Sequence, residues 1–124
     1  MPAEIVIVDG ARTPIGSFGG ALSAVPPTET AAHVARAALE RSDVAPDRVG
    51  HVVFGHVINT EPRDMYLSRV AAIEAGIPDT APAMNVNRLC GSGAQAIVSA
   101  IQSLAMGDAD YALAGGAEAM SRSP

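Results

Sequence analysis

The single cysteine of the chain, Cys90, lies in the segment 87–93 (NRLCGSG), between a predicted strand and a predicted helix. It is the one strong nucleophile in the sequence. Free backbone N–H groups and the helix dipole at the start of a helix stabilise a thiolate, and the same amides can donate to the oxyanion that develops in acyl transfer. Gly91 and Gly93 let the carbonyl of a ligand approach the backbone without meeting a Cβ atom. The segment therefore predicts thioester chemistry at Cys90.

The alternative for Cys90 is an inert cysteine in the core, since free cysteine is among the most buried residue types. Two features of the surrounding sequence favour the nucleophile. Gly-Ser-Gly follows the cysteine directly, and no charged residue occurs between Leu89 and Gly107. A helix that is apolar around most of its circumference is buried inside protein. We therefore expect a buried helix after Cys90, ending near Met106.

The rest of the sequence alternates between strand and helix patterns. A breaker-rich loop over residues 10–27 separates the first strand from a helix that begins at Thr28 as N-cap. The pattern favours an α/β fold with a mixed, mostly parallel sheet. The remaining predicted elements are a buried strand at 4–9, strands at 49–58, 81–86 and 111–114, and a helix at 65–75.

Composition and charge exclude several classes of protein. The 124 residues suffice for one domain, and 48% hydrophobic with 17% charged residues exclude a disordered chain. The net charge is −5 and the eight arginines are scattered, so no basic stripe for nucleic acid is present. One cysteine excludes a disulfide framework and a multi-cysteine zinc site, and it fits a reducing, cytoplasmic location. Neither a signal peptide nor a membrane span is visible in the sequence.

Several motifs in one order resemble the thiolases, the acyl-CoA acyltransferases. The segment 87–93 (NRLCGSG) resembles their nucleophile motif, 12–20 (RTPIGSFGG) their N-terminal signature, and 55–57 (GHV) their glycine-containing second strand. The segment 115–121 (GGAEAMS) resembles their GG-x-E-x-MS motif, and 61–66 (EPRDMY) is similar to broad-specificity β-ketothiolases. The resemblance covers essentially the whole chain and implies the thiolase-type layered fold.

The resemblance also implies a reaction and its site. Cys90 would accept an acyl group as a thioester, with its backbone amide in the oxyanion hole, and Gly91 and Met65 would lie at the substrate. The acyl-enzyme then condenses with acetyl-CoA, or, in reverse, CoA cleaves a 3-ketoacyl-CoA in fatty acid, ketone or polyhydroxyalkanoate metabolism. Coenzyme A is a substrate or product, and neither a further cofactor nor a metal is expected.

Thiolases are about three times as long as this sequence, so residues 1–124 resemble an incomplete N-terminal domain. By the resemblance, the activating histidine, the second cysteine and the coenzyme A-binding loop domain lie in the absent part, in the same or a separate chain. The strand at 81–86 would pair with its mate in a homodimer, or in a tetramer of two dimers. Two alternatives stay open: a non-catalytic fragment or subunit of such an assembly, and another condensing enzyme, such as a ketoacyl synthase.

The other polar residues have structural interpretations. His51 and His56 differ by an odd number and so face opposite sides of one strand, which disfavours a metal site between them. His56 is interpreted as structural or near the dimer contact. Glu118 is interpreted as buried and hydrogen-bonded rather than catalytic, and Asn87 as ordering the turn before the cysteine. Arg12 could meet a phosphate or form an ion pair that orders its loop.

Overall fold

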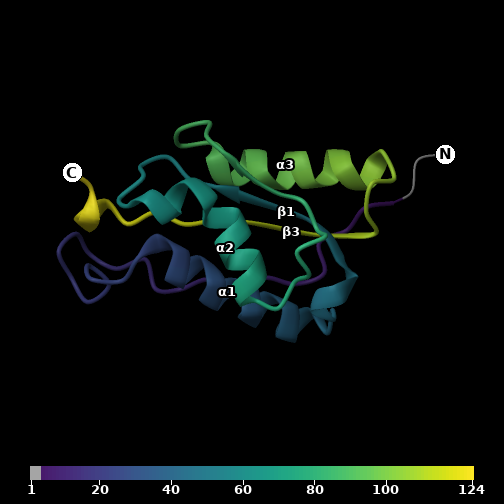
Figure 1. The fold of residues 1–124 in the computed structure, drawn as a ribbon, viewed down its shortest axis with the longest axis horizontal. Coiled ribbons are helices and arrows are strands. Elements are labelled where there is room, and N and C mark those ends of the chain that lie inside the picture. Colours follow the sequence, from purple (N-terminus) through teal and green to yellow (C-terminus); the bar gives the residue numbers. More distant parts are fainter. Residues whose placement is uncertain (1–3) are drawn as a thin grey trace.

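The structure, a computed structural model, describes residues 4–124 as three layers, with a parallel sheet between two layers of helices (Figure 1). Helices α1 and α2 cover one face of the sheet and α3 covers the other. The expected α/β class is confirmed. The elements in chain order are α1 (Pro27–Ser42), β1 (Val49–Gly55), α2 (Leu67–Glu74), β2 (Ala83–Val86), α3 (Ser92–Ala105) and β3 (Tyr111–Gly116), with short 3-10 helices at η1 (Pro46–Arg48), η2 (Pro62–Tyr66) and η3 (Met120–Arg122).

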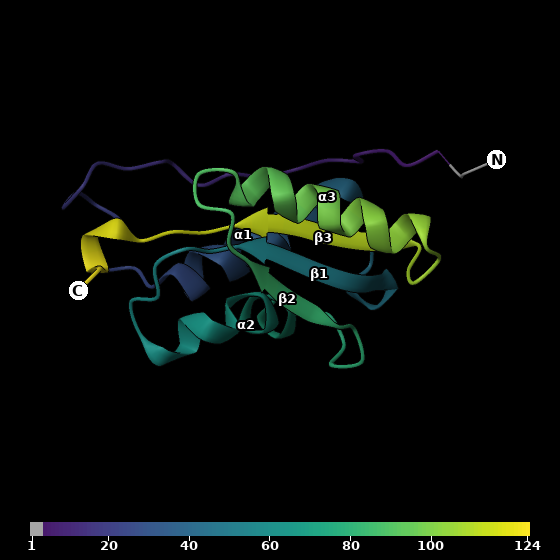
Figure 2. The same ribbon diagram turned by 90° about the horizontal axis from the view of Figure 1, so that it is seen from above.

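Strand β1 is the centre of the sheet, whose order is β2-β1-β3 (Figure 2). Both pairings are parallel, and Val52 stands opposite Ala83 on one side and Leu113 on the other. Successive side chains of a strand point to opposite faces. Val52 therefore joins the core beneath α1 and α2, whereas Val53 joins the smaller core beneath α3. Parallel strands bring their carboxyl ends to one edge, where the chain enters the Cys90 segment.

The first helix begins two residues earlier than the sequence pattern indicates. Pro26 is the N-cap of α1 and Pro27 its first residue, while Thr28 is buried inside the first turn. The prediction of Thr28 as N-cap is wrong, because the fixed φ of proline suits the first helical position and moves the start forward. The predicted helix at 65–75 is divided, with the 3-10 helix η2 leading into α2.

Residues 4–9 do not form the buried strand that their sequence predicts. They are extended but unpaired, and Val6, Ile7 and Val8 are 65%, 77% and 57% exposed. In Figure 2 the segment runs beyond β3, on the side away from β2. A β-branched run becomes a buried strand only where another strand supplies its hydrogen bonds, and no strand within residues 4–124 does so.

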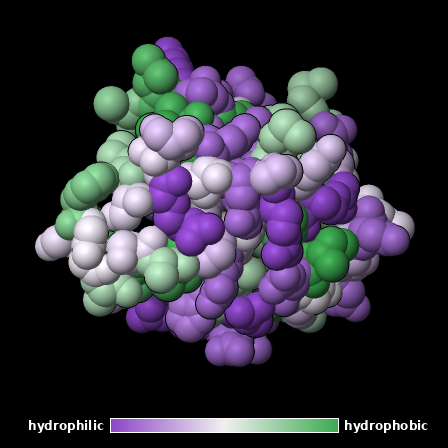
Figure 3. Space-filling model, turned by 60° about the vertical axis from the view of Figure 1, so that its left-hand side comes forward, coloured by the Kyte–Doolittle hydropathy of each residue, from purple (hydrophilic) through white to green (hydrophobic). Residues whose placement is uncertain are grey.

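Helix α3 is buried on one face rather than all round. Ala96 and Ala100 pack on the sheet, but Ile97, Val98 and Ile101 are 40% to 46% exposed. The expectation of a fully buried helix is corrected for residues 4–124, because no described element covers the outer face. On the face of the molecule drawn in Figure 3, hydrophobic residues form several separate groups among hydrophilic ones. Among residues 4–124, no helix has the length and apolarity needed to cross a membrane.

Candidate active site

Residues 87–91, here called the Cys90 loop, join the end of β2 to the start of α3. Three hydrogen bonds fix their backbone. The Leu89 N–H donates to Asn87 Oδ1 at 3.0 Å, and the Arg88 N–H donates to Ser92 Oγ at 2.8 Å. The Ser92 hydroxyl in turn donates to the Leu89 carbonyl at 2.6 Å. The expectation that Asn87 orders the turn is confirmed, and Ser92 is the second residue that does so.

Leu89 has φ of +48°, in the left-handed region that side chains with a Cβ rarely adopt. Such residues persist where neighbouring contacts over-determine the backbone. Here its N–H and its carbonyl are both held by side chains of the loop and of α3. The turn sets the direction of the peptide that leads into Cys90.

Cys90 is exposed, so its interpretation as an inert core residue is wrong. It stands immediately before Gly91, the N-cap of α3, and this helix end has no side-chain cap. The N–H groups of Gly91 and Ser92 donate to the carbonyls of Arg88 and Leu89, whereas the N–H of Cys90 makes no hydrogen bond within residues 4–124 and is therefore available to a ligand. An exposed thiol with its own backbone amide free can attack a thioester carbonyl while that amide binds the oxygen that becomes negative.

Gly55 allows α3 to approach the end of β1. A Cβ atom on Gly55 would stand 2.8 Å from the carbonyl carbon of Ser92, a distance that real Cβ contacts essentially never show. The first residue of α3 therefore rests directly on the backbone of the central strand. This contact sets the height of Cys90 above the edge of the sheet.

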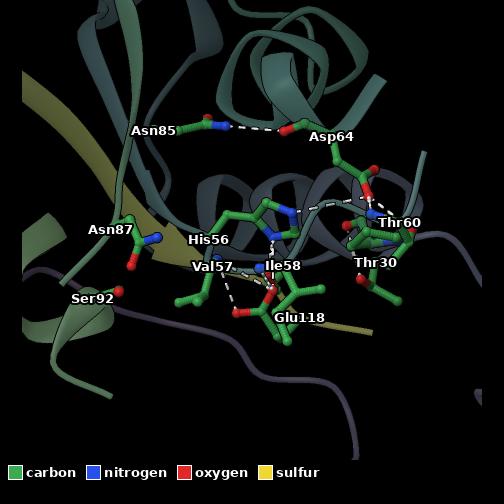
Figure 4. Close-up of polar contacts among 12 residues, drawn as sticks. Thr30, His56, Val57, Ile58, Thr60, Asp64, Asn85, Asn87, Ser92 and Glu118 are labelled. Atoms are coloured by element: carbon green, nitrogen blue, oxygen red, sulfur yellow. Dashed lines mark hydrogen bonds and ion pairs between the residues drawn. The ribbon is translucent and has the colours of Figure 1, made fainter. Parts of the chain in front are cut away.

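Glu118, which follows β3, binds the backbone that follows β1 at the carboxyl edge of the sheet (Figure 4). Its carboxylate accepts hydrogen bonds from the Val57 N–H at 3.0 Å and the Ile58 N–H at 3.0 Å. Its side chain is 28% exposed, so the expectation that Glu118 is hydrogen-bonded is confirmed and the expectation that it is buried is not. A carboxylate of this kind satisfies the two amides that follow the end of β1, where no neighbouring strand does so.

The imidazole of His56 lies between Glu118 and Asp64 (Figure 4). Its Nδ1 is 2.8 Å from the Ala117 carbonyl oxygen and 3.1 Å from Glu118 Oε1, and the residue is 4% exposed. Its Nε2 faces Asp64 Oδ2 at 3.9 Å and has no hydrogen-bond partner. The structural interpretation of His56 is confirmed by these contacts.

Asp64 is fully buried, and sequence reasoning missed it. Its Oδ2 accepts hydrogen bonds from the Thr60 N–H, the Thr60 hydroxyl and the Glu61 N–H, at 2.6, 2.8 and 3.2 Å. With Glu61 it forms a capping box at the start of η2. The spacing of acceptors three residues apart around a proline was the available signal.

The other predicted site residues are placed less closely. Gly91 is the half-buried N-cap of α3, beside Cys90. Met65 lies on η2 with 57% exposure, and its carbonyl accepts a hydrogen bond from Asn85 on β2. Arg12 is exposed and donates to the Thr13 carbonyl at 2.8 Å, without an ion pair among residues 4–124. No group of three or more metal-ligating side chains occurs in that same part of the chain.

The fold and the Cys90 loop together define an α/β domain that carries a thiol at the junction of a strand and a helix. Comparison with known proteins specifies its family: the family model described as "Thiolase, N-terminal domain" matches residues 5–124, and the chain belongs to this family. The resemblance inferred from the motifs is thereby confirmed.

Individual relatives agree with the family. The chain is 61% identical over 124 residues to the β-ketothiolase BktB of Cupriavidus necator, covering 100% of this chain and 32% of that protein. The crystal structure of the Bacillus anthracis acetyl-CoA acetyltransferase superposes with a TM-score of 0.90 at 44% identity, over 96% of this chain and 30% of that one. The crystal structure of human mitochondrial 3-ketoacyl-CoA thiolase in complex with CoA superposes with a TM-score of 0.92 at 39% identity, over 94% of this chain and 30% of that one. The chain thus spans about a third of the length of these relatives.

Proposed function

We propose that this chain supplies the nucleophile of an acyl-CoA acyltransferase, a thiolase, and that Cys90 is that nucleophile. The observation that carries the proposal is the exposed Cys90 thiol at the uncapped N-terminus of α3. The names of the relatives support the reaction class, since they are a β-ketothiolase, an acetyl-CoA acetyltransferase and a 3-ketoacyl-CoA thiolase.

In the cleavage direction, the Cys90 thiolate attacks the 3-keto carbon of a 3-ketoacyl-CoA. The bond between C2 and C3 breaks, its electron pair leaves on the acetyl-CoA fragment, and a proton completes acetyl-CoA. The thiolate of a second coenzyme A then attacks the acyl-cysteine, releasing acyl-CoA and the Cys90 thiolate. Condensation follows the same steps in reverse.

The backbone N–H of Cys90, which makes no hydrogen bond within residues 4–124, stabilises the negative oxygen in these steps. Its position is suited to the task, because the adjacent Gly91 carries no Cβ atom between the backbone and a bound carbonyl.

The remaining groups belong to the part of a thiolase beyond the matched third. No histidine or carboxylate of residues 4–124 makes a hydrogen bond with Cys90, so the proton acceptor for its thiol comes from that part. It also supplies most contacts to coenzyme A.

We place the protein in the cytoplasm, in keeping with one unpaired cysteine. We also propose a homodimer or tetramer through the free edge of β2.

Intact mass and peptide mapping test the role of Cys90. The protein expressed from its complete gene is mixed briefly with acetoacetyl-CoA and denatured in acid. We expect one acetyl group on the Cys90 peptide of the wild type, and neither the acetyl group nor turnover in Cys90→Ala. Ser103→Ala, at a half-buried position of α3, is a matched control and should acylate normally. Full turnover by Cys90→Ala, or acetyl transfer to another residue, would overturn the proposal.

A further inference from the structure

The dipeptide Gly55–His56 at the end of β1 contacts the chain on both sides of the Cys90 loop. The His56 N–H donates to the carbonyl of Val86 at 3.0 Å, and Val86 immediately precedes the loop. Gly55 packs against Ser92, which immediately follows the loop. One anchor on the central strand therefore fixes both ends of the segment that carries the thiol.

The same dipeptide holds Ala117 by two hydrogen bonds. The Ala117 N–H donates to the Gly55 carbonyl at 3.1 Å, and the ring of His56 reaches the Ala117 carbonyl through Nδ1 at 2.8 Å. A carbonyl oxygen only accepts, so Nδ1 carries the proton in this contact. The ring is nearly inaccessible to solvent, and water therefore does not compete for this bond.

We propose that His56 is a positioning residue for the reaction at Cys90, acting through its Nδ1–H group. The inference rests on the proposed function. The bond from Nδ1 to Ala117, together with the bonds from Val57 and Ile58 to Glu118, fixes the backbone that follows β1. That backbone in turn fixes the two ends of the Cys90 loop, and a shift of about 1 Å in a reacting group can cost on the order of 100-fold in rate.

The second ring nitrogen has no comparable contact. Nε2 lies 3.9 Å from Asp64 Oδ2, beyond hydrogen-bond distance, and is without a partner. The two nitrogens can therefore be separated by substitution. The amide nitrogen of asparagine occupies the place of Nδ1, whereas that of glutamine, one methylene further out, occupies the place of Nε2.

The test compares His56→Asn with His56→Gln in the protein expressed from its complete gene. Steady-state thiolysis of acetoacetyl-CoA gives kcat and KM, and thermal unfolding shows that each variant is folded at the assay temperature. We expect kcat of His56→Asn within about 2-fold of the wild type. We expect kcat of His56→Gln to fall about 10-fold with KM little changed, because binding persists while the thiol is displaced.

Two controls complete the design. His51→Gln replaces the histidine that lies within β1, which makes no hydrogen bond with Val86 or Ala117, and should leave kcat unchanged. Equal kcat values for the two His56 variants, or a fall confined to KM, would overturn the positioning role while leaving Cys90 as nucleophile. Turnover that survives Cys90→Ala would instead overturn the proposed function itself. If His56→Gln does not fold, equal acylation rates of Cys90 in wild type and His56→Leu would overturn the inference.

Discussion

Gly55 and Ser92 are in direct backbone contact, so that a methyl group on Gly55 would stand 2.8 Å from the Ser92 carbonyl carbon. This contact joins the end of the central strand to the first residue of the helix that follows Cys90. The position of the thiol above the sheet therefore depends on the absence of a methyl group at Gly55, the last residue of β1.

Gly55→Ala should destabilise the protein and lower its activity. The added methyl group meets backbone rather than a flexible side chain, so the N-terminus of α3 must move, at a cost of about 1–3 kcal/mol in the free energy of unfolding. Urea unfolding and kcat measure the two effects. Gly10→Ala is the matched control, since a Cβ there meets nothing within 4 Å. Equal stability of the two variants would contradict the tight contact.

Ser92→Ala should loosen the Cys90 loop. The variant loses the hydroxyl that accepts from the Arg88 N–H and donates to the Leu89 carbonyl. We expect a loss of about 1–2 kcal/mol in stability, and slower alkylation of Cys90 by iodoacetamide because the turn at Leu89 relaxes.

Ser42→Ala serves as the comparison for Ser92→Ala. The hydroxyl of Ser42 contacts only the Leu39 carbonyl at the end of α1, at 3.1 Å. Its removal should leave the alkylation rate of Cys90 unchanged. An alkylation rate of Ser92→Ala equal to that of Ser42→Ala would show that the loop keeps its geometry without the hydroxyl.

The local features of the fold could be predicted from the sequence. The β-branched run at 49–58 predicts β1, and the uncharged run after Cys90 predicts α3, because each signal lies in a few adjacent residues. The strand at 4–9 failed for the opposite reason. Its residues have a strong β pattern, but pairing depends on a partner strand, and none within residues 4–124 lies beside it.

The contacts that shape the site could not be read from the sequence. Gly55 and Ser92 are 37 positions apart and His56 and Glu118 are 62 apart by their numbers. Their meeting follows from the parallel order β2-β1-β3, which brings three carboxyl strand ends to one edge. Neither residue type nor spacing encodes that order, so Ser92 carried no visible signal of its role. The capping-box spacing of Glu61 and Asp64 indicates the start of η2 but not that Asp64 faces His56.

Glu118→Gln should weaken the closure of the sheet edge. The carboxylate accepts from two amides, and glutamine offers one acceptor oxygen and places an NH2 group against the other amide. A stability loss of about 1–2 kcal/mol is expected from the unpaired amide. Glu40→Gln, exposed on α1, should change stability by less than about 0.5 kcal/mol. Thermal unfolding measures the stability of both variants, and equal stabilities would mean that water replaces the carboxylate of Glu118.

Asn85 joins β2 to the corner between η2 and α2. Its Oδ1 accepts from the Ser68 N–H at 2.9 Å, and its Nδ2 donates to the carbonyls of Asp64 and Met65 at 3.0 and 3.2 Å. An aspartate at this position keeps the bond to Ser68. It loses both donors, however, and turns a negative oxygen toward two carbonyl oxygens.

Asn85→Asp should therefore cost about 2 kcal/mol in stability at neutral pH, as two lost hydrogen bonds and a repulsive contact add. Part of this loss should return in acid, where protonation removes the charge and restores one donor. Urea unfolding at both pH values measures the change. Asn59→Asp, an exposed site of the same chemistry, provides the baseline for pH effects elsewhere in the protein. A loss in Asn85→Asp no larger than in Asn59→Asp would show that the amide donors do not hold Met65 and η2 against β2.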